Sequence, residues 1–281
     1  MAKEFRMTRQ ACLEVQDVWF TYEDSPSAAL RGVSLTIEDG DFVALIGQNG
    51  SGKTTLAKHF NGLLRPTQGK VLLYGEDIHN RPVGTLARRV GYVFQNPDHQ
   101  IFSPTTREEL AVGPRNLGLD EAEIERRVAE ALASFGLEPY TDRQPAVLGF
   151  GLRRKISVAA VYTMQTPILI LDEPTTGLDY RSTTELMELT CKLHQQGHTI
   201  ILITHDMRVV AEYVPRCLVL REGQILADGD TRTVFKQVDL LRETHIELPQ
   251  ISQLSHRMVQ YGMPDDTLTV SEFCEAYNRL R

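Results

Sequence analysis

Residues 42–54 read Phe-Val-Ala-Leu-Ile-Gly-Gln-Asn-Gly-Ser-Gly-Lys-Thr, and this stretch decides the fold. The apolar run Phe42–Ile46 predicts a buried β-strand that leads directly into Gly47–Thr54, the full eight-position pattern of a phosphate-binding loop before a helix. Glycines let backbone N–H groups face phosphate oxygens, Lys53 reaches the β- and γ-phosphates, and Thr54 ligates magnesium. Strand, glycine loop and helix in this order indicate a nucleotide site rather than a plain glycine-rich turn.

Two adjacent carboxylates follow another apolar run. Ile168–Leu171 predicts a buried strand that ends at Asp172 and Glu173. Open α/β sheets bind their ligands at the carboxyl ends of strands, and neighbouring residues of a strand point in opposite directions. One carboxylate can therefore reach the magnesium ion while the next orients the water that attacks the γ-phosphate. We assign Asp172 to the metal and Glu173 to the water.

The remaining pattern predicts an α/β fold. Strand and helix alternate across residues 168–213, which requires a parallel sheet with crossover helices. Residues 13–37 predict a β-rich subdomain at the start, and residues 96–163 a helical insertion. The tail holds two short helical patterns separated by Pro264. We therefore expect a nucleotide-binding domain over residues 1–246 and a small helical appendage over 247–281.

Composition excludes several classes of protein. The formal net charge of -7, without a block of Lys and Arg, argues against binding nucleic acid through its phosphates. The four cysteines lie far apart and form no C-x-x-C pair, so they predict neither a disulfide framework nor a zinc site. The longest apolar runs are the length of a strand, and the polar start lacks the apolar region of an export signal. We expect a cytoplasmic protein that does not span a membrane.

Together these motifs resemble those of ATP-binding cassette (ABC) ATPases, from about residue 13 to 230. The resemblance implies that Gln95 contacts magnesium and the attacking water and couples the site to a membrane partner. His205, which follows the predicted strand 199–203, corresponds to the switch histidine that contacts the γ-phosphate. Tyr22 corresponds to the aromatic platform for adenine, with Phe20 and Trp19 as alternatives.

The resemblance extends to a loop with Asp179 and to the partner-facing segment described next. The expected ATP contacts are Tyr22, Gly47, Asn49, Gly50, Ser51, Gly52, Lys53, Thr54, Thr55, Gly149, Gly151 and Asp179. The expected catalytic residues are Lys53, Gln95, Glu173 and His205, and the expected magnesium ligands are Thr54, Gln95 and Asp172.

One segment departs from the family. Where ABC ATPases usually carry Leu-Ser-Gly-Gly-Gln, this chain has Leu-Gly-Phe-Gly-Leu at residues 148–152. In the family this signature segment closes on the γ-phosphate bound by the other subunit of a dimer, so Gly149 and Leu152 replace its serine and glutamine. Either the dimer has two unequal sites, with a paralogue as the favoured partner, or backbone donors suffice and both sites remain competent.

A narrower resemblance is to the ATPase subunits of energy-coupling factor importers. It rests on residues 91–119, which include Gln-Asn-Pro-Asp-His-Gln and Gly-Pro-Arg-Asn-Leu, and on residues 240–251 of the tail. It implies a second ABC ATPase subunit, a transmembrane scaffold subunit and a membrane substrate-binding subunit for a vitamin or transition-metal ion. The chain would lie peripherally on the cytoplasmic face of the cell membrane.

Some residues of the sequence, and the function itself, allow other interpretations. His99 is expected to be a solvated loop residue, and the pair Arg88–Arg89 and the cluster Arg153–Lys155 are expected to be surface charge, with contacts to a partner as the alternative. A soluble ABC ATPase that acts on DNA, ribosomes or Fe–S assembly would share the phosphate-binding loop, although such relatives usually carry a second ATPase domain, a coiled coil or basic tracts. A weakly hydrolysing nucleotide sensor is a third possibility, against which Glu173 and His205 weigh.

Overall fold

The computed structural model describes residues 10–280. Among these residues, one sheet is antiparallel, with the order β2-β1-β4-β5. Its strands are β1 (Ala11–Phe20), β2 (Leu30–Glu38), β4 (Gln68–Leu73) and β5 (Glu76–Asp77). β-branched and aromatic residues favour these strands, and their buried side chains face the rest of the fold. This sheet is the β-rich start that the sequence predicts.

The second sheet positions the site. Its order is β10-β9-β3-β8-β7-β6, and every neighbouring pair is parallel except β9 with β10. The strands are β3 (Phe42–Gly47), β6 (Val90–Val93), β7 (Ile168–Asp172), β8 (Thr199–Ile203), β9 (Arg216–Arg221) and β10 (Gln224–Asp230). Helices cover both faces, so β3, β7 and β8 are buried along their whole length. Their carboxyl ends meet at one edge.

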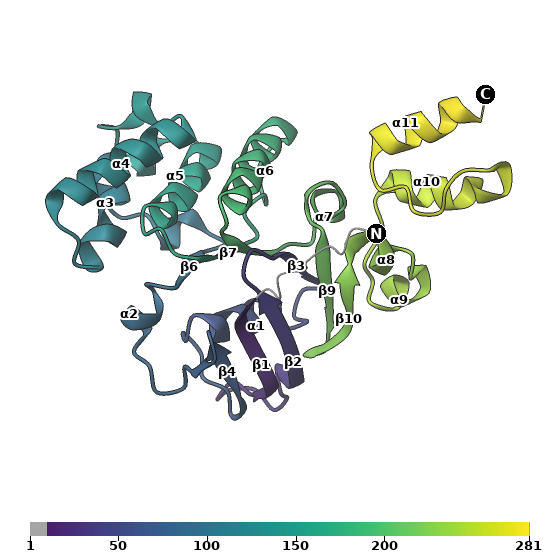
Figure 1. Ribbon diagram of the computed structural model, residues 1–281, viewed down its shortest axis with the longest axis horizontal. Coiled ribbons are helices and arrows are strands. Elements are labelled where there is room, and N and C mark those ends of the chain that lie inside the picture. Colours follow the sequence, from purple (N-terminus) through teal and green to yellow (C-terminus); the bar gives the residue numbers. More distant parts are fainter. Residues whose placement is uncertain (1–9, 281) are drawn as a thin grey trace, which may run out of the picture.

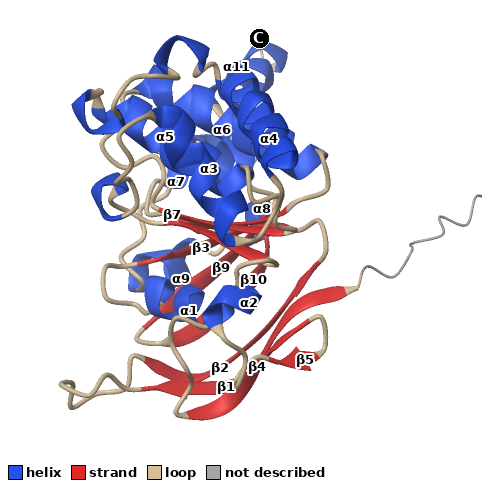
Figure 2. Ribbon diagram, turned by 90° about the vertical axis from the view of Figure 1, so that its left-hand side faces the viewer, coloured by secondary structure: helices blue, strands red, loops and turns tan. Residues whose placement is uncertain are grey.

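The helices form separate layers on the two faces of this sheet (Figure 2). α1 (Lys53–Phe60) lies between the two sheets, where Leu56 and Phe60 pack into a core shared with β1 and β3. The helices on the other face include α6 (Tyr180–Gln195) and α7 (Met207–Tyr213). The parallel α/β fold is therefore as predicted.

The predicted insertion is a group of helices at one end of the molecule (Figure 1). It contains α3 (Thr106–Asn116), α4 (Glu121–Phe135) and α5 (Phe150–Tyr162), with short 3₁₀ turns at Pro97–His99, Glu138–Tyr140 and Pro145–Val147. α2 (Val83–Leu86) precedes it. Asp120 caps α4 by accepting from the Glu123 N–H, and Gly136 ends it with a φ of +61°. Both ends of α4 follow from local sequence.

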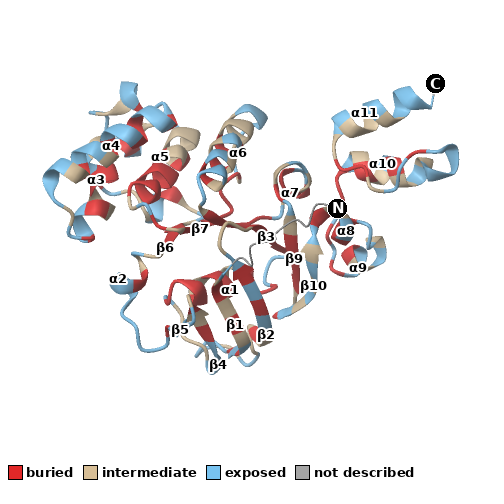
Figure 3. Ribbon diagram, in the orientation of Figure 1, coloured by how far each residue is buried: buried red, intermediate tan, exposed pale blue. Residues whose placement is uncertain are grey.

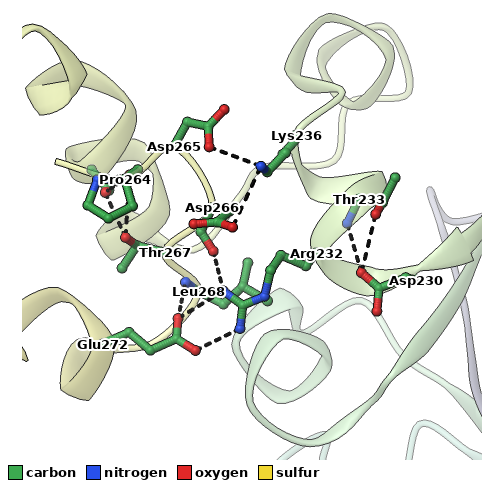
Figure 4. A network of polar contacts seen from close by, with 11 residues as sticks. Asp230, Arg232, Thr233, Lys236, Pro264, Asp265, Asp266, Thr267, Leu268 and Glu272 are labelled. Atoms are coloured by element: carbon green, nitrogen blue, oxygen red, sulfur yellow. Dashed lines mark hydrogen bonds and ion pairs between the residues drawn. The ribbon is translucent and has the colours of Figure 1, made fainter. Parts of the chain in front are cut away.

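The tail holds α8 (Thr231–Phe235), α9 (Val238–Glu243), α10 (Gln250–Met258), a 3₁₀ turn at Val259–Tyr261 and α11 (Val270–Arg279). α10 and α11 flank Pro264 as predicted, and much of their surface is exposed (Figure 3). Figure 4 shows the ion pairs that attach them to α8: Arg232 with Glu272 at 2.7 Å, and Lys236 with Asp265 at 3.0 Å. These ion pairs are exposed, so they orient the appendage more than they stabilise it.

Candidate functional site

The loop between β3 and α1 is shaped by its glycines. Gly50 and Gly52 have φ values of +81° and +106°, which residues with side chains rarely adopt. At Gly47 a Cβ atom would lie 2.3 Å from the carbonyl oxygen of Leu220, so only glycine fits against β9. The Lys53 ammonium folds over this loop and donates to the carbonyl oxygens of Gly47 and Gln48, each at 2.8 Å.

Two polar groups of this loop are poised for an anion. Within residues 10–280, the buried hydroxyl of Ser51 has no hydrogen-bond partner, although buried hydroxyls normally have one. Burial lowers the pKa of Lys53, and the nearby carboxylates of Glu173 and Asp172 oppose that shift. A phosphate group would supply the missing partner of Ser51 and a counter-charge for Lys53.

Asp172 ends β7 as a buried carboxylate. It accepts hydrogen bonds from the Tyr92 hydroxyl at 2.7 Å and from the Thr54 hydroxyl at 3.3 Å. Burial raises the pKa of Asp172, while these two hydrogen bonds act in the opposite direction. A hydroxyl beside a carboxylate offers the hard oxygen ligands that Mg²⁺ prefers. The described part of the chain contains no cluster of three or more His, Cys, Asp or Glu that would hold a metal by itself.

Glu173 and His205 are in direct contact. Glu173 adopts a φ of +48°, a conformation that a non-glycine residue holds only when its surroundings impose it, and its N–H donates to the Ile203 carbonyl at 2.8 Å. The carboxylate lies 2.9 Å from Nδ1 of His205 and accepts from the Thr176 hydroxyl at 3.0 Å. Glu173 is thus held in one place at the carboxyl end of β7.

A cleft of about 290 Å³ brings most of the predicted residues together. Its lining includes Tyr22, Asn49, Gly50, Gly52, Lys53, Thr54, Thr55, Gln95 and Glu173. Gly47 and His205 line a second cleft that adjoins it through Asn49.

Of the three aromatic candidates for adenine, only Tyr22 lines the cleft, with its hydroxyl 3.0 Å from that of Thr55. Phe20 is buried in the core, and the Trp19 Nε1 donates to Asp17. The geometry favours Tyr22, and its contact with adenine stays a prediction.

Three predicted contacts lie outside the phosphate-binding loop and line neither cleft. Gly149 stands immediately before α5, Gly151 lies in its first turn, and Asp179 caps α6 by accepting from the Ser182 N–H at 2.7 Å. None of the three lines either cleft in the described chain. They remain predictions that require a second subunit.

Two residues that contact the site were not predicted from the sequence, and a third was predicted to be exposed but is buried. Thr176 could have been predicted from the sequence, because it stands three residues after Glu173 in the same turn. Tyr92 had no local signal, because its contact with Asp172 depends on the pairing of β6 with β7. The expectation of surface charge is wrong for Arg154, which is 1% exposed. Its guanidinium is held inside the fold by backbone carbonyls, where a lysine or arginine is seldom found.

Known proteins resemble this chain over most of its length. The family model described as "ABC transporter" matches residues 30–176. An energy-coupling factor transporter ATP-binding protein EcfA from Methanothermobacter thermautotrophicus is 39% identical, covering 92% of this chain and 84% of the relative. A cobalt import ATP-binding protein CbiO from Syntrophus aciditrophicus is 43% identical, covering 93% and 94%. A putative ABC transporter ATP-binding protein from Caldanaerobacter subterraneus is longer, and this chain spans 43% of it.

The fold agrees with these relatives. The structure of cbiO1 from Clostridium perfringens, described as part of the ABC transporter complex cbiONQ, superposes with a TM-score of 0.76 at 35% identity, covering 87% of this chain and 98% of that one. Family, fold and a cleft that unites the phosphate-binding loop with Glu173 all agree. The chain therefore belongs to the ABC transporter family, as an ATPase subunit of the kind that couples ATP hydrolysis to transport and that resembles those of energy-coupling factor importers.

Proposed function

We propose that this chain is the ATP-hydrolysing motor of an energy-coupling factor importer, in which separate membrane subunits take up a vitamin or a transition-metal ion. The observation that carries the proposal is the path of the loop that begins at Gln95. Gln95 lines the nucleotide cleft, and Gln100 and Phe102 of the same loop line a groove of about 350 Å³ on the helical group. One loop thus links the nucleotide cleft to a groove that fits a partner.

In this proposal the described side chains divide the work of hydrolysis. Lys53 and the N–H groups before α1 bind the β- and γ-phosphates. Glu173 accepts a hydrogen bond from the attacking water and places it against the γ-phosphate, while His205 fixes the carboxylate. Thr54, Asp172 and Gln95 would hold a magnesium ion, which when bound neutralises charge on the phosphates.

The groove beside the loop suits a helix from a membrane subunit. Its lining is largely apolar, with Val112, Leu117, Val161 and Met164 on the helical group. Phe102 stands at this groove with 76% of its surface exposed, so it extends the apolar lining into solvent. Among the helices of residues 10–280, none has both the length and the apolar character needed to cross a bilayer. We infer a peripheral position on the cytoplasmic face, with the groove toward the transmembrane scaffold.

Replacement of Phe102 by Glu tests this orientation. Aromatic anchors at the centre of an interface commonly contribute about 2 kcal/mol or more, so F102E should weaken binding of the membrane scaffold by about thirtyfold. The variant should keep the affinity of the parent for ATP. The measurement is recovery of an integral membrane scaffold with the tagged chain from detergent-solubilised membranes.

Leu226→Glu in β10 is the control, because Leu226 is also exposed but lies far from the groove in sequence and structure. Crosslinks from the membrane partner that reach only residues 248–281 would contradict this orientation. Recovery with DNA or ribosomes, and with no membrane protein, would instead favour a soluble ABC ATPase.

A second ATPase subunit completes the proposal. Gly149, Gly151 and Asp179 would meet the nucleotide of that partner, and residues 1–246 would act as one nucleotide-binding domain. Residues 247–281 would contribute a further contact between subunits, since α10, the turn after it and α11 expose several apolar side chains. These are Leu254, Val259, Tyr261, Val270, Tyr277 and Leu280. We favour a paralogue with an intact Leu-Ser-Gly-Gly-Gln segment as the partner.

Restoring the signature segment tests the unequal dimer. The double change Gly149→Ser and Leu152→Gln should raise ATP hydrolysis by the isolated chain about tenfold to a hundredfold, since one hydrogen bond to a charged phosphate contributes about 1.5–3 kcal/mol. The position tolerates the change, because nothing lies within 4 Å of a Cβ atom built on Gly149.

Ser at residue 149 would also cap α5, so Gly149→Asn, which caps a helix without a hydroxyl or a charge, serves as the control for helix stability. The proposed heterodimer is contradicted if the parent chain alone forms an ATP-dependent homodimer that hydrolyses ATP rapidly and that the double change leaves unaltered.

A further inference from the structure

The loop that follows Gln95 is fastened to α5 by buried side chains. Two N–H groups of the Arg154 guanidinium donate to the carbonyl oxygens of consecutive residues, at 2.8 Å to Phe94 and also to Gln95. The planar fork of arginine can reach two neighbouring acceptors at once, which a lysine ammonium cannot do with the same geometry. Arg154 therefore fixes the backbone at the point where Gln95 enters the nucleotide cleft.

Gln100 makes a second bridge between the same two elements. Its side-chain oxygen accepts from the Phe94 N–H at 3.3 Å, and its Nε2 donates to the Ser157 carbonyl of α5 at 2.8 Å. Arg153 adds an ion pair with Asp98 at the exposed side of the loop. The loop is thus joined to α5 by three side chains, those of Arg153, Arg154 and Gln100.

The far end of the loop is anchored elsewhere in the helical group. Glu109 of α3 is 3% exposed, and one of its carboxylate oxygens accepts from the N–H groups of Phe102 and Ser103, at 3.0 and 2.8 Å. The segment from Gln95 to Ser103 is therefore held to α5 at its start and to α3 at its end. It has little freedom to move independently of these helices.

Arg154 also connects this loop to the segments that would meet a partner. Its guanidinium lies 5.4 Å from the centre of the Phe150 ring, at the start of α5. A Cβ atom on Gly177 would lie 3.2 Å from the same ring, so Phe150 packs directly against residues 175–179. Burial opposes the charge of Arg154, and the nearby carboxylates of Asp172 and Glu173 favour it. The described chain offers its Nε no hydrogen-bond partner.

We propose that Arg154 is a positioning residue that locks the Gln95–Ser103 loop to the amino-terminal end of α5, so that Gln95, the groove and the signature segment move as one body. A helix that shifts Phe102 in the groove would then displace both Gln95, at the nucleotide bound by this chain, and Gly149–Gly151, at the nucleotide of the partner. This consequence for transport rests on the proposed function, whereas the attachment of the Gln95–Ser103 loop to α5, which we call the joint, is a property of the isolated chain.

Amide hydrogen exchange on the full-length chain tests the joint without any partner. In Arg154→Gln, the amides of Phe94, Gln100 and Ile101 should exchange about tenfold to a hundredfold faster, because two hydrogen bonds from a charged donor are lost. In the assembled complex, with rates normalised to the folded fraction that binds ATP, the same variant should keep the KM for ATP and lower kcat.

Arg127→Gln is the matched control. The Arg127 side chain is 14% exposed and likewise donates to two consecutive carbonyl oxygens, those of Thr163 and Met164 at 3.2 Å each, but at the other end of α5. It should lower the melting temperature and leave exchange in residues 94–101 unchanged. Equal acceleration of those amides by Arg127→Gln would mean general loosening and would overturn the proposal.

A second variant covers the case in which Arg154→Gln does not fold. Gln100→Met removes the other bridge and leaves no buried charge, so it should accelerate the amides of Gln100 and Ile101 by a smaller factor, and that of Phe94, which loses its own acceptor, at least as much as Arg154→Gln. Parental exchange rates in whichever of Arg154→Gln and Gln100→Met folds would overturn the proposal that these side chains lock the loop to α5. Failure to recover a membrane subunit would count against the proposed function alone, because the exchange experiment does not depend on it.

Discussion

Replacement of Glu173 by Gln should lower ATP turnover by about 10²–10⁴-fold, the usual contribution of a positioned general base. The amide has nearly the volume of the carboxylate and can still accept from the Thr176 hydroxyl, so the local geometry should survive. It loses the negative charge that attracts a proton from the attacking water. ATP should bind with nearly parental affinity, because Lys53 and the loop before α1 are unchanged. Bound ATP should then accumulate, and the ATP-dependent dimer should persist.

Glu185→Gln gives the matched control for this experiment. Glu185 on α6 carries the same functional group but forms only surface ion pairs, with Lys155 at 3.3 Å and Arg181 at 3.0 Å, and exposed pairs contribute little. Turnover is best measured in the assembled complex, with ATP binding followed separately. Hydrolysis by E173Q at the parental rate would show that another group orients the water.

Much of the nucleotide site could be predicted because its signals are local. A strand that ends in a glycine loop fixes Lys53 and Thr54, and a strand that ends in two carboxylates fixes Asp172 and Glu173. Parallel strands end at the same edge of a sheet, so the sequence alone indicated that these groups would meet. The position of His205 after β8 follows from the same rule.

The contacts that were missed depend on pairing between distant segments. Tyr92 meets Asp172 only because β6 lies beside β7 in parallel register, and nothing around residue 92 reveals that neighbour. Arg154 looked like part of a basic surface cluster because Arg153 and Lys155 flank it. On a helix, however, adjacent residues point about 100° apart, so one of three consecutive basic residues can be buried while the others reach solvent. Which one turns inward depends on the carbonyl groups of the Gln95 loop.

Replacement of Lys53 by Ala should produce a different defect from that of E173Q. The ammonium is the one lysine of the cleft lining, and removing one partner of a desolvated charge pair costs about 3–5 kcal/mol. ATP affinity should therefore fall by roughly a hundredfold to a few thousandfold. The fold itself should be weakened only slightly, because the loss of the hydrogen bonds from Lys53 to the Gly47 and Gln48 carbonyls is offset by removal of a charge that burial disfavours and by the helix preference of Ala.

This combination gives a specific thermal signature. At an ATP concentration of about a hundred times Kd, binding adds about 2.7 kcal/mol to the stability of the parent, and K53A should lose nearly all of this gain while melting like the parent without nucleotide. E173Q should retain the gain, so the two variants separate binding from hydrolysis. Lys70→Ala on the exposed face of β4 is the control and should keep the parental response. A K53A protein that still binds ATP tightly, by calorimetry and by its thermal shift, would place the phosphates away from the loop between β3 and α1.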